Sequence, residues 1–149
     1  MLDFAKRLDA VRARMDAENI GLMFLRPGSN LWYLAGIRRQ DHYRTDHNAY
    51  GDWVVGGYIG LEEGVVLTAP RMGGEYYKAQ AAGKPWLEPV RIIDESEDPM
   101  DVMGEVLKRF DLQGKGVAVE DHAWAQSAES LRQLLPEADV TMAADLIAP

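Results

Sequence analysis

The stretch RLDAVRARMDAENIGLMFLRPGSNLWYLAGI, from Arg7 to Ile37, decides the fold of this chain. Apolar side chains recur at three- and four-residue spacing between Phe4 and Met15, which predicts a one-sided helix over residues 3–18. The six residues from Ile20 to Leu25 are all apolar or glycine, a pattern typical of a strand that is covered on both faces. A helix followed directly by a buried strand is therefore expected.

The second half of this stretch predicts a turn and a short helix. Pro27-Gly28 ends the strand, because proline and glycine interrupt regular structure. Asn30 is predicted to cap a short helix that carries Trp32 to Leu34. Gly36 is expected to let the backbone turn tightly after that helix.

The rest of the chain alternates between strand and helix patterns. Residues 53–61 and 65–69 flank Glu62-Glu63-Gly64, which predicts a β-hairpin with Gly64 at positive φ. Helices are expected within residues 70–83, from Asp98-Pro99 to Gly114, and before Pro136, and short strands at residues 90–93, 117–119 and 140–142. The alternation predicts a single α/β domain, residues 1–149, with three layers and a mixed, partly antiparallel sheet flanked by helices.

Composition excludes several classes of function. The chain has 16 basic and 24 acidic residues, a formal net charge of −8, and its cations are scattered along the sequence. Nucleic-acid binding is disfavoured, because it depends on clustered cations. No cysteine is present to form a disulfide, a thiolate nucleophile or a cysteine-based zinc site. No signal sequence and no apolar run of about 20 residues is found, so no membrane association and a cytoplasmic location are expected.

The opening stretch resembles the start of the amino-terminal domain shared by creatinases, prolidases and aminopeptidase P, the Xaa-Pro peptidases. The resemblance is carried by Arg7-Leu8, Met15, the strand from Gly21 to Leu25, Asn30 and Tyr33-Leu34-Ala35-Gly36. It implies a creatinase/prolidase-type fold along nearly all of the chain. It also implies that the catalytic domain, with its pita-bread fold, is absent from this chain, so no catalytic residue is assigned here.

The resemblance implies a function for the longer protein. Such a protein is expected to hydrolyse an Xaa-Pro peptide or a related amide C–N bond. In the peptidase branch of the family the missing domain would hold a divalent metal, Mn, Zn or Co, whereas the creatinase branch uses a related pocket without metals; no metal is expected in this domain. This domain would contribute to a homodimer and to the active-site entrance, with its own C-terminal catalytic domain as partner. The alternative is a free-standing α/β module that binds a small ligand or has a regulatory role.

A long polar loop over residues 38–52 is the candidate functional segment, because it contains no aliphatic side chain larger than alanine. It is longer and more charged than expected for a simple prolidase, which leaves the substrate class open. Proton-transfer, cationic and aromatic groups that could border an active-site entrance are His42, Tyr43, Arg44, His47, Tyr50 and Trp53.

The same loop contains Asp41-His42 and Asp46-His47, whose side chains are of the types that bind transition metals. No zinc motif such as His-Glu-x-x-His accompanies them, so a solvated loop is favoured over a metal site. Pro27 to Asn30 lacks the glycine and lysine pattern of a phosphate-binding loop. Asp121-His122 has no matching nucleophile and is interpreted as a loop at the end of a strand.

Overall fold

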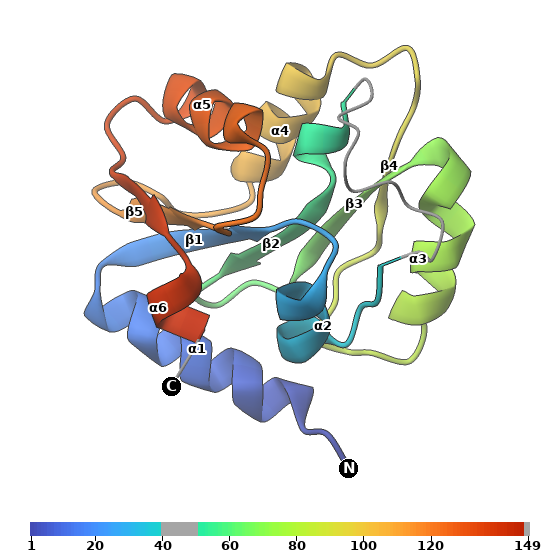
Figure 1. Cartoon of the computed structure of the whole chain (residues 1–149), viewed down its shortest axis with the longest axis horizontal. Coiled ribbons are helices and arrows are strands. Elements are labelled where there is room, and N and C mark those ends of the chain that lie inside the picture. The colour runs from blue at the N-terminus through green and yellow to red at the C-terminus, as the bar shows by residue number, and fades with distance from the viewer. Residues whose placement is uncertain (40–50, 148–149) are drawn as a thin grey trace.

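The computed structural model describes residues 1–39 and 51–147 of the chain. Helices and strands alternate along it (Figure 1). The elements, in chain order, are α1 (Phe4–Ala17), β1 (Ile20–Leu25), α2 (Ser29–Ala35), η1 (Asp52–Val54), β2 (Gly56–Gly60), β3 (Val66–Pro70), η2 (Arg71–Gly73), α3 (Gly74–Ala81), β4 (Arg91–Ile93), α4 (Pro99–Leu107), β5 (Gly116–Val119), α5 (Ala125–Leu134), β6 (Val140–Met142) and α6 (Ala144–Ile147).

The strands form one mixed sheet in the order β4-β3-β2-β1-β5-β6. β2 pairs antiparallel with both β1 and β3, whereas β3–β4, β1–β5 and β5–β6 are parallel pairs. It follows that β1, β3, β4, β5 and β6 all run in one direction and β2 runs against them. The predicted α/β class with a partly antiparallel sheet is confirmed.

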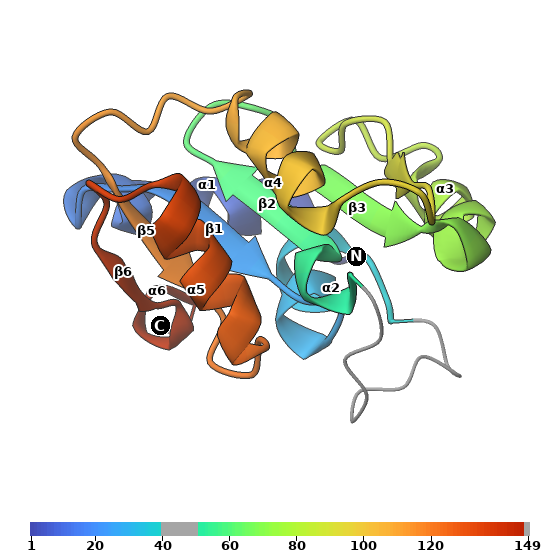
Figure 2. The same ribbon diagram turned by 90° about the horizontal axis from the view of Figure 1, so that it is seen from above.

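Two apolar clusters cover the two faces of the sheet, because side chains alternate in direction along a strand. From β1, Met23 and Leu25 belong to the cluster that packs under α1, α2, α3 and α6. Leu22 and Phe24 belong to the cluster that packs under α4 and α5. All six residues of β1 are buried, as the continuous apolar pattern predicted. Figures 1 and 2 show the resulting three layers, with α4 and α5 on one side of the sheet and α1 on the other.

The sequence placed some element ends incorrectly. Residues 53–55 are not strand: η1 occupies Asp52–Val54 and β2 begins at Gly56. The helix that begins at Pro99 ends at Leu107 instead of reaching Gly114. Gly114 does have positive φ, 72°, but it turns the chain just before β5. Phe110 lies beyond the end of α4 but still packs into the core. Its apolar side chain continues the helical spacing, which is why the sequence placed the end of the helix too late.

Gly64 in the β2–β3 turn does not have the conformation that the sequence predicted. It is not among the described glycines with positive φ. A Cβ at this position would lie 2.6 Å from Oε1 of Glu88, the end of a flexible side chain that would have to move aside. Among the described residues, no helix is long and apolar enough to span a bilayer.

The helix α4 starts at the Asp98-Pro99 pair that the sequence indicated, and its capped N-terminus provides a direct test. Asp98 accepts a hydrogen bond from the backbone N–H of Met100 at 2.8 Å, and Pro99 occupies the first turn. Asp98→Ala is expected to lower the free energy of unfolding by about 1 kcal/mol, because one backbone donor loses its partner. Chemical denaturation measures this loss. Asp98→Asn, which keeps the cap, should lie close to wild type, and equal losses in both variants would contradict the capping role.

Candidate functional site

One edge of the sheet collects most of the candidate functional groups. Because β1 and β5 are parallel, with Phe24 opposite Val119, the residues that follow them lie side by side. The start of β2 reaches the same edge, because Gly57 pairs with Leu25. In α/β sheets, ligands commonly bind outside the carboxyl ends of parallel strands. The flanks of the 38–52 loop, α2 and the loop after β5 therefore converge at the edge where ligands are expected.

Glu120, the first residue after β5, connects the two parallel strand ends. Its side chain is only 5% exposed. Oε2 accepts a hydrogen bond from the backbone N–H of Arg26 at 2.9 Å, and Oε1 accepts one from Nδ2 of Asn30 at 2.8 Å. Its own backbone N–H donates to the carbonyl of Phe24 at 3.0 Å. Glu120 thus fixes the turn that leads from β1 into α2.

The environment of Glu120 perturbs its ionisation. Burial raises the pKa of Glu120 above its ordinary value, because the charged form loses water. The hydrogen bonds from Asn30 and Arg26, and the positive charge of Arg26, oppose part of this rise. The carboxyl group is held by donors on both oxygens and is buried at a strand end, so we assign it a positioning role.

Arg26 makes a second connection across the same edge. Its Nη1 donates to the carbonyl oxygen of His122 at 2.8 Å, and its guanidinium lies 5.3 Å from the ring centroid of Trp124. His122 and Asp121 are exposed in the loop that follows β5, as the sequence predicted. Together with Glu120, this contact fixes the β1–α2 turn against the loop after β5.

An open hollow of about 480 Å³ lies beside this turn. It is lined by Gly28, Ser29, Trp32, Arg38 and Arg39. The guanidinium of Arg38 lies 5.5 Å from the Trp32 ring centroid. Guanidinium donors beside an indole face suit a carboxylate attached to a flat or apolar group. These lining residues supply groups for binding. Ser29 has no histidine or carboxylate beside it among the described residues of the lining, so the lining contains no pair of nucleophile and base.

The backbone that carries the two arginines is anchored on α3. The side-chain amide of Gln80 accepts from the N–H of Arg38 at 2.7 Å and donates to its carbonyl at 2.8 Å. The hydroxyl of Tyr76 donates to the carbonyl of Arg39 at 3.2 Å. Hydrogen bonds from α3 therefore fix the backbone of Arg38 and Arg39, the two arginines that line the hollow.

The site residues predicted from sequence fall into two groups. His42, Tyr43, Arg44, His47 and Tyr50 lie outside the described residues, as do the aspartates beside the two histidines. Within the described ranges, no group of three or more histidine, cysteine, aspartate or glutamate side chains could hold a metal ion.

Trp53 is described, and it is 5% exposed within the core under α4 and α5. Its carbonyl accepts a hydrogen bond from Oγ of the buried Ser127 at 2.6 Å. The structure thus places Trp53 as an anchor for the far end of the 38–52 loop. Its ring is not part of the hollow.

Sequence analysis missed Glu120 and misassigned Asn30. The helix α2 begins at Ser29, and Asn30 lies inside it without capping it. The amide of Asn30 donates to Glu120 instead, across a separation of 90 residues. The sequence signal available for Glu120 was a carboxylate directly after a buried strand, where functional side chains often lie. Gly36, in contrast, has φ 74° and ends α2 as predicted.

Comparisons with known proteins place this geometry in context. The family model for the creatinase/prolidase N-terminal domain matches residues 7–149. No curated protein sequence matches the chain significantly. A prolidase from Thermococcus sibiricus has a similar structure, with a TM-score of 0.74 at 14% identity over 99% of this chain and 36% of that one.

Two streptococcal structures match over nearly their whole length. A proline dipeptidase from Streptococcus pneumoniae aligns with a TM-score of 0.70 at 17% identity, over 99% of this chain and 95% of that chain. The creatinase/prolidase N-terminal domain of an X-Pro dipeptidase from Streptococcus pyogenes aligns with a TM-score of 0.68 at 17% identity, over 92% and 98%. At these identities, the likeness shows the fold alone. The chain spans about a third of the Thermococcus protein.

Proposed function

The chain belongs to the creatinase/prolidase N-terminal domain family, and from this premise we propose that it is the non-catalytic amino-terminal domain of a larger hydrolase. In that protein it borders the active-site entrance and takes part in dimer assembly. The active site itself belongs to a second, C-terminal domain. This proposal assigns binding and closure, and no bond-breaking step, to the residues of this chain.

Two kinds of solved structure support the division into domains. The matched region makes up 36% of the Thermococcus prolidase chain and 35% of a dipeptidase chain from Mycobacterium ulcerans, so comparable domains occur within longer chains. The domain from the Streptococcus pyogenes X-Pro dipeptidase was solved over almost the same length as this chain.

The observation that carries the entrance role is the convergence of groups at the carboxyl edge of the sheet. Gln80 and Tyr76 hold the backbone of Arg38 and Arg39 on one flank of the 38–52 loop, and Trp53 is buried at the other flank. Both flanks are therefore fixed to the same edge. Polar groups between two fixed flanks can be presented to a neighbouring domain or subunit while the hydrophobic core stays packed.

The chemistry proposed for the longer protein follows from the family. A divalent metal such as Mn, Zn or Co in the second domain would activate a water molecule to hydrolyse an Xaa-Pro peptide or a related amide C–N bond. The cationic hollow of this domain would favour substrates or products that carry a carboxylate. Reading the gene downstream of Pro149 tests whether the longer protein exists, because the proposal requires a second, C-terminal domain. A stop codon shortly after Pro149 would favour a free-standing binding module.

The loop itself is tested in the full-length enzyme by replacing His42 and His47 with alanine. We expect kcat/KM to fall by about tenfold or more, because contacts made by the loop at the entrance are removed. His122→Ala is the matched control, since it removes the third histidine of the chain from a different loop. Unchanged kcat and KM in the double variant would reject the entrance role of these histidines.

A further inference from the structure

The hollow beside the β1–α2 turn has two walls that are fixed in different ways. One wall, at α2, supplies Gly28, Ser29 and Trp32, and the other is formed by Arg38 and Arg39. The walls approach each other where the guanidinium of Arg38 lies 5.5 Å from the Trp32 ring centroid. The affinity of the hollow for a ligand therefore depends on what holds each wall in place.

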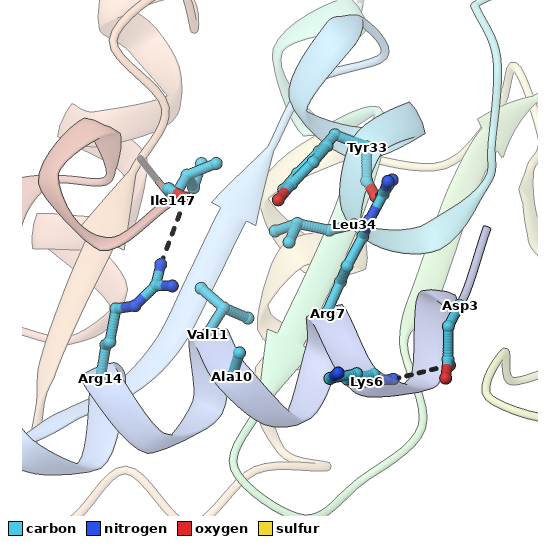
Figure 3. A pocket seen from close by; sticks show the side chains of 9 residues that line it. All are labelled: Asp3, Lys6, Arg7, Ala10, Val11, Arg14, Tyr33, Leu34 and Ile147. Atoms are coloured by element: carbon cyan, nitrogen blue, oxygen red, sulfur yellow. Dashed lines mark hydrogen bonds between the residues drawn. The ribbon is translucent and has the colours of Figure 1, made fainter. Parts of the chain in front are cut away.

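The α2 wall is held by α1 and by the loop after α3. Nη1 of Arg7 in α1 donates to the carbonyl of Tyr33 at 2.8 Å, and its guanidinium lies 4.2 Å from the Tyr33 ring centroid. Figure 3 shows this arginine reaching from α1 to the tyrosine on α2. At the end of α2, Nε1 of Trp86 donates to the carbonyl of Ala35 at 2.9 Å. Neither contact involves the second wall, so Trp32 is positioned independently of the arginines of the hollow.

The second wall is held by side chains of α3. The chain leaves the core at Ile37, which is fully buried. Beyond it, the side-chain amide of Gln80 accepts from the N–H of Arg38 at 2.7 Å and donates to the carbonyl of the same residue at 2.8 Å. The hydroxyl of Tyr76 donates to the carbonyl of Arg39 at 3.2 Å. The backbone of both arginines is thus tied to one helix.

The helix α3 is a firm support for these two side chains. Tyr77, next to Tyr76, is buried in the core, and the two tyrosine rings pack edge to face with their centroids 5.5 Å apart. A Cβ on Gly74, the first residue of the helix, would lie 2.5 Å from Cδ1 of Ile92 in β4, so the helix begins in close contact with the sheet. Gln80 and Tyr76 therefore join the arginine segment to the core.

The lining of the hollow suits an anion. Its described residues include two guanidinium groups and no carboxylate, on a chain whose net charge is −8. A guanidinium presents N–H donors in a planar fork that matches a carboxylate, and an indole face suits a flat or apolar group attached to that carboxylate. A fork that is already in position binds more tightly, because ordering a mobile side chain costs binding free energy. The contacts that position the arginines therefore influence the affinity directly.

We propose that Gln80 and Tyr76 are positioning residues for this hollow. By fixing the backbone of the two arginines opposite Trp32, they set the affinity of the hollow for a carboxylate attached to a flat or apolar group. The role of such binding rests on the proposed function, in which the hollow borders an active-site entrance. The binding itself is a property of residues 1–149, so it can be measured without a second domain.

The test titrates residues 1–149 with benzoate and follows the indole N–H resonance of Trp32 by NMR. Benzamide, which has nearly the same shape and no charge, is the matched neutral probe. In wild type, we expect benzoate to bind with a Kd of about 1 mM and benzamide to bind about tenfold more weakly, because only benzoate can form an ion pair with the guanidinium groups.

Three variants separate positioning from a general loss of structure. Gln80→Met removes both hydrogen bonds to Arg38 but keeps the length and the helix propensity of the side chain, so the benzoate Kd should rise about fivefold. Tyr76→Phe removes only the hydroxyl and should raise this Kd about twofold. Gln133→Met, the same change at an exposed position of α5, is the matched control and should leave it unchanged. The benzamide Kd should stay constant in all four proteins, whereas hydrogen exchange at the Arg38 amide should become faster in Gln80→Met.

Several results would overturn this inference. Benzoate that leaves the Trp32 resonance unmoved would show that the hollow takes no carboxylate. An equal benzoate Kd in wild type, Gln80→Met and Tyr76→Phe would show that α3 does not set the affinity. Equal weakening of benzoate and benzamide would indicate a distorted fold and would also reject the positioning role. If Gln80→Met did not fold, Tyr76→Phe alone would decide between these outcomes.

Failure of this inference can be told apart from failure of the proposed function. A gene that continues past Pro149 into a second domain would support the proposed function even if benzoate did not bind. A stop codon shortly after Pro149 would reject the hydrolase, whereas charge-selective binding that Gln80→Met weakens would still show that α3 positions the hollow.

Discussion

Replacing Gly56 with alanine is expected to lower the free energy of unfolding by about 3 kcal/mol, the upper part of the range for overpacking a core. Gly56 begins β2, where the strand passes close to β1. A Cβ at this position would lie closer than 3.0 Å to the carbonyl oxygen of Leu25 and 3.0 Å from Cε2 of Phe24. Because the first of these atoms is backbone, rotation of a side chain cannot relieve the clash.

Movement of Gly56 is also restricted by a buried polar cluster. Its N–H donates to Oγ1 of Thr68 at 3.0 Å, and that hydroxyl donates to the carbonyl of Val54 at 2.8 Å. The hydroxyl of Tyr58, which is fully buried, donates to the same carbonyl at 2.8 Å. A shift of β2 away from β1 would leave these groups without partners, which is costly in the core.

Gly104→Ala is the matched control, and it is expected to change stability in the opposite direction. Gly104 lies inside α4, and a Cβ there would meet only Cδ2 of Leu134 at 3.7 Å, an ordinary contact. Alanine should therefore stabilise the domain by about 0.5 to 1 kcal/mol, because it reduces the entropy lost when the helix forms. Urea denaturation of both variants measures the two effects. A Gly56→Ala protein as stable as wild type would reject the close-approach argument.

Much of the fold could be predicted because its strongest signals are local. The spacing of Leu8, Val11 and Met15 follows the helical period, and all three side chains are buried on one face of α1. The continuous apolar run from Ile20 to Leu25 indicated a strand covered on both faces, and helices from two layers do cover it. Such patterns depend on residues a few positions apart, which a sequence shows directly.

The errors arise where contacts between distant residues decide the outcome. Asn30 does not cap its own helix, because its side-chain amide donates to Glu120, 90 residues away. Trp53 resembles a loop aromatic in sequence, yet it packs beneath α4 and α5. Of the candidate site, the sequence indicated the 38–52 loop, most of which lies outside the described residues, so its role stays a prediction. The hollow beside Arg38 and the buried carboxylate of Glu120 could be identified only from the folded structure.

Glu120→Ala is expected to lower the free energy of unfolding by about 2 to 3 kcal/mol, because two donors lose their acceptor inside the protein. The backbone N–H of Arg26 and the amide of Asn30 would both be left without it. The turn into α2 would then keep its contact with His122 but lose both hydrogen bonds to the side chain of Glu120. Urea denaturation measures the loss, and faster hydrogen exchange at the Arg26 amide would show that it is centred on this turn.

Glu120→Gln separates the hydrogen bonds of this residue from its charge. The glutamine oxygen can accept from Arg26, and its amide can donate to Asn30 once the Asn30 side chain flips, so stability should stay within about 1 kcal/mol of wild type. A loss as large as that of Glu120→Ala would show that the hydrogen bonds require the carboxylate itself.

The free energy of unfolding should also depend on pH differently in wild type and in Glu120→Gln. Because burial raises the pKa of Glu120 in the folded state, the native protein binds its proton more readily than the unfolded chain does. The stability contributed by protonated Glu120 is therefore complete below its ordinary pKa and is lost as pH rises through the raised folded value. Glutamine has no such proton, so the stability of Glu120→Gln relative to wild type should increase as pH rises from the ordinary glutamate pKa, about 4.3, through the raised folded value. A constant difference across that range would show that Glu120 titrates as it does in the unfolded chain, and that the turn before α2 tolerates its charge without cost.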